Sequence, residues 1–159
     1  MAEGDTKHLL VVSHSQTGGT RRLVEAAVAG ARTDEIEQVE VRWRPALDAG
    51  PDDLRWADAV ILGTPENFGY MSGGLKDFFD RSYYAVLEET RGLPYALIVK
   101  GRHDDGSGAT RSVRRITTGL GWKEVQPPLI VIGDVEGEHL QQATELGQTI
   151  AAGLELGLW

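Results

Sequence analysis

The sequence contains no cysteine, which excludes disulfide bonds, thiolate catalysis and thiolate metal sites. No apolar run approaches the ~18 residues that a membrane helix needs, and no signal-peptide pattern is visible. Aromatic residues make up 7% of the chain, and its four tryptophans are scattered rather than set in a stripe for stacking on nucleic acid. A formal net charge of −8 also disfavours nucleic acid and anionic lipid. We therefore expect a cytoplasmic protein with neither nucleic acid nor a membrane as partner.

Signatures of several common sites are missing as well. Metal-ligand spacing is absent from the histidines, so no metal site is predicted; they are His8, His14, His103 and His139. There is no G-x-S-x-G motif, the signature of one large class of Ser-His-Asp hydrolases. A phosphate-accepting receiver domain needs aspartates where this chain has Ser13-His14 and Gly63-Thr64, so a signalling receiver is not expected.

What the chain does contain fits one globular domain. Its 159 residues are 41% hydrophobic and 25% charged, which is ordinary for a folded protein with a substantial core. No internal repeat, low-complexity tract or linker divides it. We therefore predict a single domain over residues 1–159.

Apolar periodicity predicts five strands that alternate with helices. The predicted strands are 9–13, 39–43, 59–62, 95–99 and 129–132, with one helical turn within 52–58 and a long loop over 64–71. Ser72 is expected to cap the helix that follows it, and Gly121 to end the next helix. The second strand alternates in polarity and the fifth follows Pro127-Pro128, so both suit sheet edges. This pattern predicts an α/β fold: a doubly wound, five-stranded parallel sheet in the order 2-1-3-4-5, within three αβα layers.

The turn between the first strand and the first helix combines hydroxyl groups with glycines, as Ser15-Gln16-Thr17-Gly18-Gly19-Thr20. Backbone N–H groups in such a turn can cradle a phosphate at the positive end of the helix. The turn lacks the lysine of a nucleoside-triphosphate loop and the spacing of a dinucleotide loop. It therefore favours a phosphate monoester, with FMN as the first ligand to consider. The alternative is a polar turn that only caps the helix.

Two motifs carry a family resemblance. The turn Ser15 to Thr20 resembles the phosphate loop of flavodoxins, and the run Gly63 to Arg81 resembles the NAD(P)H-dependent FMN reductase and quinone reductase branch of the flavodoxin-like superfamily. That run contains Gly63-Thr64-Pro65, Met71-Ser72-Gly73 and a helix with Lys76, Phe78, Asp80 and Arg81. The resemblance implies FMN as cofactor, with NADPH or NADH as co-substrate. The cofactor-binding residues that it implies are Ser15, Gln16, Thr17, Gly18, Gly19, Thr20, Pro65, Glu66, Asn67, Phe68, Gly69, Lys100, Gly101 and Arg102.

The third implied loop departs from the family pattern because Lys100 to Asp105 is unusually charged. Lys100 and Arg102 beside the pyrimidine edge of the flavin would stabilise an anionic reduced form; the alternative is a solvated loop. Phe68 or Tyr70 is expected near the ring face, with packing of Phe68 in the core as the alternative. The third loop has no aromatic residue, so one ring face is expected to be open to a hydride donor.

These features together favour an oxidoreductase that transfers a hydride from NAD(P)H through FMN to a quinone or other small acceptor. No catalytic side chain is required, because the flavin performs the chemistry. One alternative is a flavodoxin-type single-electron carrier for a redox partner protein, and another is a flavin-less binding or regulatory relative. The apolar tail that ends in Trp159 leaves open whether it docks on the domain or on a second subunit of a homodimer.

Overall fold

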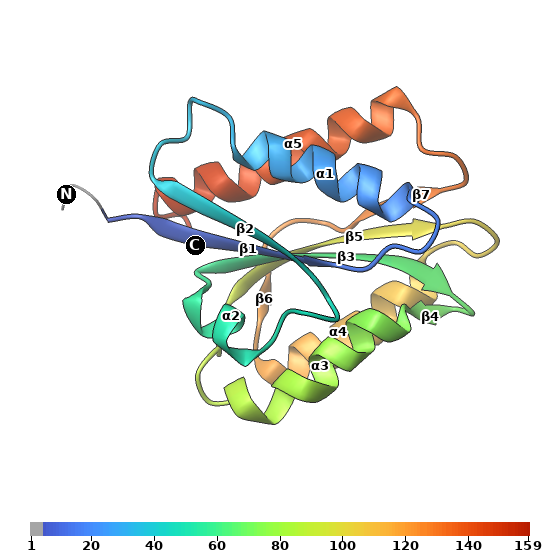
Figure 1. Cartoon of the computed structure of the whole chain (residues 1–159), viewed down its shortest axis with the longest axis horizontal. Helices are drawn as coiled ribbons and strands as arrows, with labels where there is room; N and C mark the ends of the chain where they lie inside the picture. Colours follow the sequence, from blue (N-terminus) through green and yellow to red (C-terminus); the bar gives the residue numbers. More distant parts are fainter. Residues whose placement is uncertain (1–4) are drawn as a thin grey trace.

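The computed structural model describes residues 5–159 and shows a twisted sheet between two layers of helices (Figure 1). The strands are β1 (Lys7–Ser13), β2 (Val39–Pro45), β3 (Ala59–Asn67), β4 (Tyr70–Met71), β5 (Pro94–Gly101), β6 (Lys123–Glu124) and β7 (Leu129–Ile132). The helices are α1 (Gly19–Ala31), α2 (Pro51–Trp56), α3 (Gly73–Val86), α4 (Ser107–Leu120) and α5 (Gly137–Glu155). β2, β1, β3 and β5 pair in that order, and β6 and β7 pair with β5; all of these pairs are parallel.

This arrangement confirms the predicted doubly wound α/β fold and its strand order, with β5 and β7 as the predicted fourth and fifth strands. Among the described residues, β2 pairs only with β1, and β7 only with β5, so both lie at edges as their sequences indicated. Val39, Val41 and Trp43 alternate inward on β2 because only one face of an edge strand needs an apolar cover.

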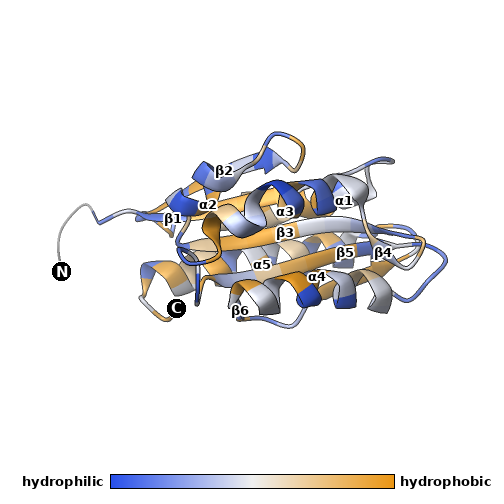
Figure 2. Ribbon diagram, turned by 90° about the horizontal axis from the view of Figure 1, so that it is seen from below, coloured by the Kyte–Doolittle hydropathy of each residue, from blue (hydrophilic) through white to orange (hydrophobic). Residues whose placement is uncertain are grey.

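The sheet separates two hydrophobic clusters, and their residues explain the layers. α1 and α5 cover one face of the sheet, whereas α2, α3 and α4 cover the other (Figure 1). Along β1, Leu9 and Val11 face the first cluster while Leu10 and Val12 face the second, all without exposed surface. Figure 2 shows the same division as hydrophobic central strands beneath helices whose outer sides are hydrophilic.

Two glycines allow α1 and α5 to cross at unusually close range. A β-carbon on Gly30 would lie 2.0 Å from the carbonyl oxygen of Thr144, and one on Gly147 would lie 1.8 Å from that of Ala27. Neither position can therefore accept a side chain without separating the helices. This contact fixes α1, and with it the turn that precedes α1, against the sheet.

The segment 64–71 was wrongly predicted as a long loop. β3 continues to Asn67, and a two-residue turn at Phe68-Gly69 leads back into β4. Both turn residues have positive φ, 53° for Phe68 and 69° for Gly69, as a tight hairpin requires. The sequence did not signal the hairpin because phenylalanine is not a residue that favours left-handed backbone. The short strand β6 was also missed.

The C-terminal tail folds back on its own helix. The indole of Trp159 covers Gly153, and its Nε1 donates to the carbonyl oxygen of Ile150 at 3.3 Å. Of the two docking modes left open by the sequence, the tail therefore adopts the one on the domain. Within residues 5–159, no helix has the length and apolar character to cross a membrane.

Candidate functional site

Three segments meet at the carboxyl ends of the central strands, at the right of Figure 1: the turn after β1, the β3–β4 hairpin and the loop after β5. Parallel strands bring such segments to one edge of a sheet, where ligands of open α/β folds bind. The implied cofactor-binding residues all lie in these segments or at the strand and helix ends beside them. The fold thus brings together residues that are up to 87 positions apart, from Ser15 to Arg102.

The turn after β1 is shaped by Ser15 and Gly18. The Ser15 hydroxyl oxygen accepts hydrogen bonds from the backbone N–H groups of Gly18 at 3.2 Å and Arg21 at 3.3 Å. Gly18 precedes the first residue of α1 with φ of 97°, a conformation that favours glycine. The side chain of Ser15 therefore closes the turn over the start of α1 and takes up one donor of its first turn.

Other N–H groups of this turn remain free to bind a ligand. Those of Thr17, Gly19 and Thr20 have no hydrogen-bond acceptor within residues 5–159. Neutral donors at the positive end of a helix suit a phosphate monoester. A cation lies beside them, because a β-carbon on Gly19 would come within 3.0 Å of the Lys100 Cε. This donor set fits the phosphate of FMN.

The turn after β1 and the hairpin are tied together. The Asn67 side-chain amide donates to the Gln16 side-chain oxygen at 3.0 Å. One strand further along, Pro65 lies in register with Lys100 of β5. The phosphate turn, the hairpin and the end of β5 therefore have fixed relative positions.

Glu66 joins the hairpin to the loop after β5 through its side chain. Its two carboxylate oxygens accept the backbone N–H groups of Gly106 and Ala109, each at 2.8 Å. These residues lie at the start of α4. Its N-cap residue, Gly106, has no side chain that could accept hydrogen bonds from the first N–H groups of the helix, and the Glu66 carboxylate accepts them instead. A negative charge at this position also complements the helix dipole. The sequence implied Glu66 only as a cofactor-binding residue; the structure adds this capping role, which sequence spacing could not reveal.

Phe68 stands at the tip of the hairpin with its ring in solvent. Its relative exposure is 105%, which excludes the alternative that it packs in the core. The hairpin instead rests on α4 through its backbone: a β-carbon on Gly108 would lie 2.1 Å from the carbonyl oxygen of Gly69. Tyr70, 43% exposed, follows on β4. Two aromatic rings are thus available at this edge of the sheet.

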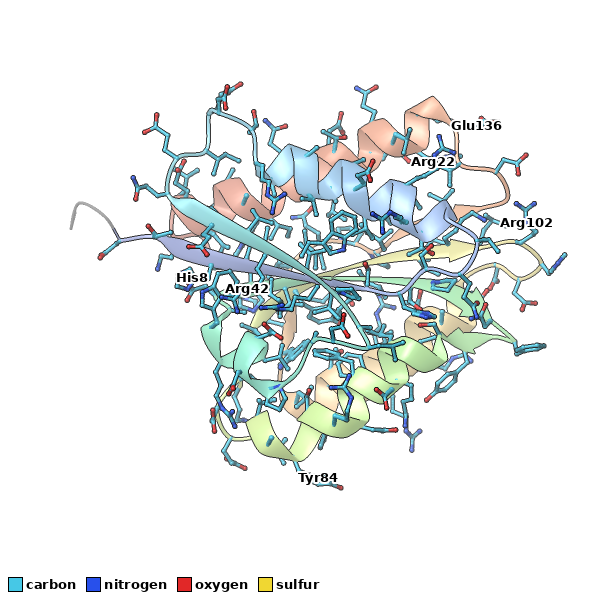
Figure 3. All side chains as sticks on the ribbon, viewed as in Figure 1. His8, Arg22, Arg42, Tyr84, Arg102 and Glu136 are labelled. Atoms are coloured by element: carbon cyan, nitrogen blue, oxygen red, sulfur yellow. The ribbon has the colours of Figure 1, made fainter. Side chains whose placement is uncertain are left out.

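The two cations of the third loop occupy different surroundings. Lys100 is half-buried against α1 and donates to the Gly101 carbonyl oxygen at 3.1 Å; burial, and then the charge of Arg102, lowers the pKa of its ammonium. Arg102, labelled in Figure 3, is exposed and pairs with Asp134 at 3.1 Å. Gly101 has little space, because a β-carbon would lie 2.8 Å from the Ile132 Cδ1. Placement of both cations beside the flavin pyrimidine edge stays a prediction.

An open hollow of about 640 Å³ separates the hairpin from the third loop. Phe68 and Gly69 line one side, the acidic segment His103 to Asp105 lines the other, and the start of α4 forms the floor. The lining includes Glu66, Phe68 and Gly69 of the implied hairpin residues but none of the implied residues 100–102, which precede the acidic segment.

Comparison with known proteins identifies the family. Residues 8–137 match the model of the family described as NADPH-dependent FMN reductase. The chain belongs to this family. The resemblance inferred from the two sequence motifs is therefore confirmed.

Individual proteins similar to this FMN reductase family member carry names of flavin-linked redox proteins. A protein of Aquifex aeolicus named flavodoxin is 38% identical over 72 residues, which cover 45% of this chain and 38% of that protein. An NAD(P)H dehydrogenase (quinone) of Acidithiobacillus ferrooxidans is 36% identical over 92 residues, which cover 46% of each. The chain thus spans less than half the length of these curated relatives.

A solved structure agrees at the level of the fold. A flavodoxin from the domain Archaea superposes with a TM-score of 0.79 at 22% identity, over 93% of this chain and 99% of that one.

Two histidines of this family member pack against neighbouring residues. His8 stacks on Trp56 with 4.3 Å between ring centroids, and the His14 ring packs against Gly74. His103 is exposed in the third loop. In the part of the chain that the structure describes, no group of three or more histidine, cysteine or acidic residues could hold a metal ion.

Proposed function

We propose that this chain binds FMN and transfers reducing equivalents from NAD(P)H to a quinone or other small acceptor. The observation that carries the proposal is the set of N–H groups of Thr17, Gly19 and Thr20, at the start of α1, that have no acceptor among residues 5–159. Membership of the NADPH-dependent FMN reductase family supports the same chemistry. Residues 1–159 would act as one domain, because both hydrophobic clusters pack on a single sheet.

Each segment of the site has a distinct part in holding the cofactor. The turn Ser15 to Thr20 would bind the FMN phosphate, and the half-buried Lys100 would add a positive charge beside it. The segment Pro65 to Gly69 would hold the isoalloxazine ring from one side, and residues 100–102 from the other. Bound FMN supplies the redox chemistry, while the chain positions it and sets the local charge.

Ligand titration tests the cradle, because riboflavin is FMN without its phosphate. We expect wild-type protein to bind FMN more tightly than riboflavin. Gly18→Ala forces a β-carbon into left-handed backbone at the cradle and should weaken FMN binding roughly 10-fold, about 1.4 kcal/mol. Riboflavin affinity should change little. Equal affinities of the wild type for the two ligands would refute the cradle, and no flavin binding at all would favour the flavin-less alternative.

Gly92→Ala is the matched control for that titration. Gly92 also has positive φ, 82°, and open space around a β-carbon, but it precedes β5 at the opposite edge of the sheet. Both substitutions should lower the free energy of unfolding by a similar amount, about 1 kcal/mol. Only Gly18→Ala should affect FMN affinity. Equal weakening in the two variants would mean that general destabilisation, and not the cradle, explains the loss.

A second candidate function is a carrier that exchanges single electrons with a protein partner. Asp104 and Asp105 place exposed carboxylates beside the hollow, where they would oppose an anionic reduced flavin. The relative named flavodoxin points the same way. Steady-state oxidation of NADPH with a soluble quinone separates the two: the reductase turns over, and the carrier does not.

A further inference from the structure

A second pocket opens on the flank of the phosphate turn that faces away from the hairpin. It has a volume of about 510 Å³ and is lined by the end of β1, the turn itself, Arg21 of α1, and Trp43 and Pro45 of β2. No residue of the hairpin or of the loop after β5 lines it. The flavin ring site inferred above therefore does not reach this pocket, which shares only Ser15, Gln16 and Gly18 with the proposed phosphate cradle.

The pocket combines an aromatic ring of fixed orientation with a cation that has no acidic partner among residues 5–159. The Trp43 Nε1 donates to the hydroxyl oxygen of buried Ser13 at 2.9 Å, which sets the orientation of the indole. The Arg21 guanidinium carbon lies 5.4 Å from the centre of the indole ring. Arg21 is exposed, and within residues 5–159 its guanidinium has no acidic partner. A guanidinium is well suited to bind a phosphate monoester, and an indole offers a surface for a purine.

We propose that this pocket binds the adenosine 2′-phosphate end of NADPH, and that Arg21 is the residue that distinguishes NADPH from NADH. The inference rests on the proposed function, because it supposes that a pyridine nucleotide reaches a flavin held at the hairpin. Arg21 would bind the 2′-phosphate, which NADH lacks. Trp43 would contact the adenine, which both nucleotides share.

The dimensions of the sheet support this placement. The strand order from the pocket to the third loop is β2, β1, β3, β5. Three strand spacings of ~4.8 Å separate the two ends, roughly 14 Å in all. A dinucleotide extended along the carboxyl edge can bridge that gap, with nicotinamide at the hollow and adenosine at the pocket.

FMN carries a phosphate monoester of the same chemistry, so the experiment must separate the two sources. Arg21→Gln removes the positive charge, and Arg21→Lys keeps it. Arg22→Gln is the matched control, because Arg22 is the next residue on α1 but donates to the Val135 carbonyl oxygen at 3.3 Å, beside the start of α5 (Figure 3). The ligands are 2′,5′-ADP, 5′-AMP, FMN and riboflavin, each titrated calorimetrically; the two adenosine ligands are titrated into FMN-loaded full-length protein.

We expect Arg21→Gln to weaken 2′,5′-ADP binding ~10- to 100-fold, the loss of a charged hydrogen-bonding group, while 5′-AMP and FMN binding stay unchanged. Arg21→Lys should recover part of the loss, and Arg22→Gln should resemble the wild type. Unchanged 2′,5′-ADP binding in Arg21→Gln would overturn the proposal. Selective loss of FMN over riboflavin would also overturn it, and would assign Arg21 to the flavin phosphate.

Steady-state kinetics then test the consequence for specificity. Arg21→Gln should raise KM for NADPH with little change in kcat, and leave KM for NADH as it was. Trp43→Leu should raise KM for both. If wild-type protein binds 2′,5′-ADP but oxidises neither nucleotide, the proposed function fails while the pocket assignment stands. If wild-type protein oxidises NADPH and NADH equally well, the assignment of Arg21 fails while the proposed function stands.

Discussion

Phe68 has two properties that folding alone does not favour: left-handed backbone with φ of 53° and a ring wholly in solvent. Left-handed backbone costs an ordinary side chain about 1–2 kcal/mol, and asparagine or glycine would avoid most of that. Its ring makes no compensating contact with the core. Strain of this kind often marks a functional position, which fits an aromatic ring presented to a ligand.

Replacement of Phe68 by asparagine should therefore have opposite effects on folding and function. Because asparagine tolerates the turn, the free energy of unfolding should rise by about 1 kcal/mol. NADPH–quinone turnover should fall, because the ring contact is lost. Urea unfolding and steady-state assays measure the two effects. Lower stability would show that the ring contributes to folding, and unchanged turnover would remove it from the site.

Single residues also show where sequence reasoning succeeds and where it stops. The N-cap role of Ser72 is confirmed, because its hydroxyl accepts the Leu75 N–H at 3.1 Å, and so is the left-handed stop at Gly121. Both follow from local chemistry. The Glu66 cap of α4 and the Asn67–Gln16 contact join residues about 40 to 51 positions apart. No local pattern encodes such pairs, since they depend on which strands become neighbours.

At the scale of elements, apolar runs were sufficient to predict the central strands, because parallel strands that are buried on both faces have nearly continuous apolar sequences. The polar ends of strands were not predicted by these runs. β3 continues through Thr64, Pro65 and Glu66, beyond its apolar run, because β5 pairs with it as far as Pro65 and β4 pairs with Glu66 and Asn67. The first turn of α1 begins at Gly19, earlier than its apolar stripe suggests, because Ser15 closes over it.

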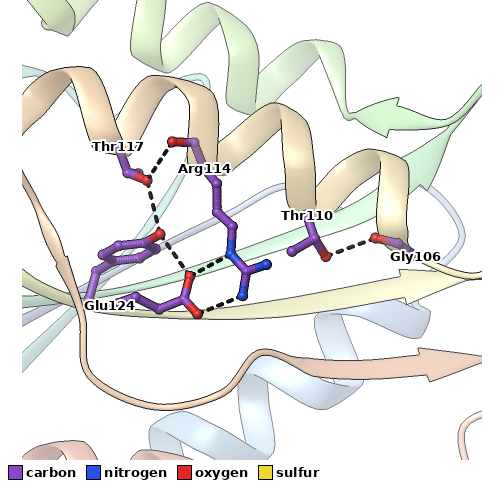
Figure 4. A network of polar contacts seen from close by, with 6 residues as sticks. Gly106, Thr110, Arg114, Thr117 and Glu124 are labelled. Atoms are coloured by element: carbon purple, nitrogen blue, oxygen red, sulfur yellow. Dashed lines mark hydrogen bonds and ion pairs between the residues drawn. The ribbon is translucent and has the colours of Figure 1, made fainter.

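A polar network joins the start of β5 to α4 and β6, at the end of β5 opposite the candidate site (Figure 4). Arg114 donates two hydrogen bonds to the Glu124 carboxylate, at 2.9 and 2.7 Å, and these lower the pKa of that carboxyl group. Burial raises the pKa of Tyr95 to about 12, so its hydroxyl stays protonated and donates to Glu124 at 3.0 Å. Thr117 completes the network by donating to the Tyr95 oxygen at 2.9 Å.

This network predicts a measurable dependence of stability on pH. A carboxyl group whose pKa is lower in the folded state stabilises the fold fully above its unfolded value of about 4.3, and loses that contribution as pH falls through the folded value. Glu124→Gln should therefore lose less stability than the wild type on acidification from pH 7. Urea unfolding at a series of pH values measures the difference. Parallel curves for the two proteins would contradict the role of Glu124.

At the scale of the whole molecule, the local charge at the carboxyl edge of the sheet differs from the net charge of the chain. The chain carries a net charge of −8, yet Arg21, Lys100, Arg102 and Arg111 surround the loops at the carboxyl edge of the sheet. Glu66, Asp104, Asp105 and Asp134 lie at the same edge, so its charge is close to balanced and repels an anionic nucleotide less than the rest of the acidic surface does. The fold itself was predictable from the sequence, because composition, periodicity and edge signals agreed. The distribution of charge could not be predicted without knowing which loops the topology brings together.

We propose that NADPH reduces FMN on this protein by two-electron transfer. The most direct measurement is an anaerobic titration of the FMN-loaded protein with NADPH, followed by flavin absorbance. We predict that an equimolar amount of NADPH converts the oxidised spectrum directly into that of the fully reduced flavin, with isosbestic points throughout. An unchanged spectrum with NADPH, together with reduction by a chemical reductant in two separate one-electron steps, would contradict the account and assign the protein to electron carriage.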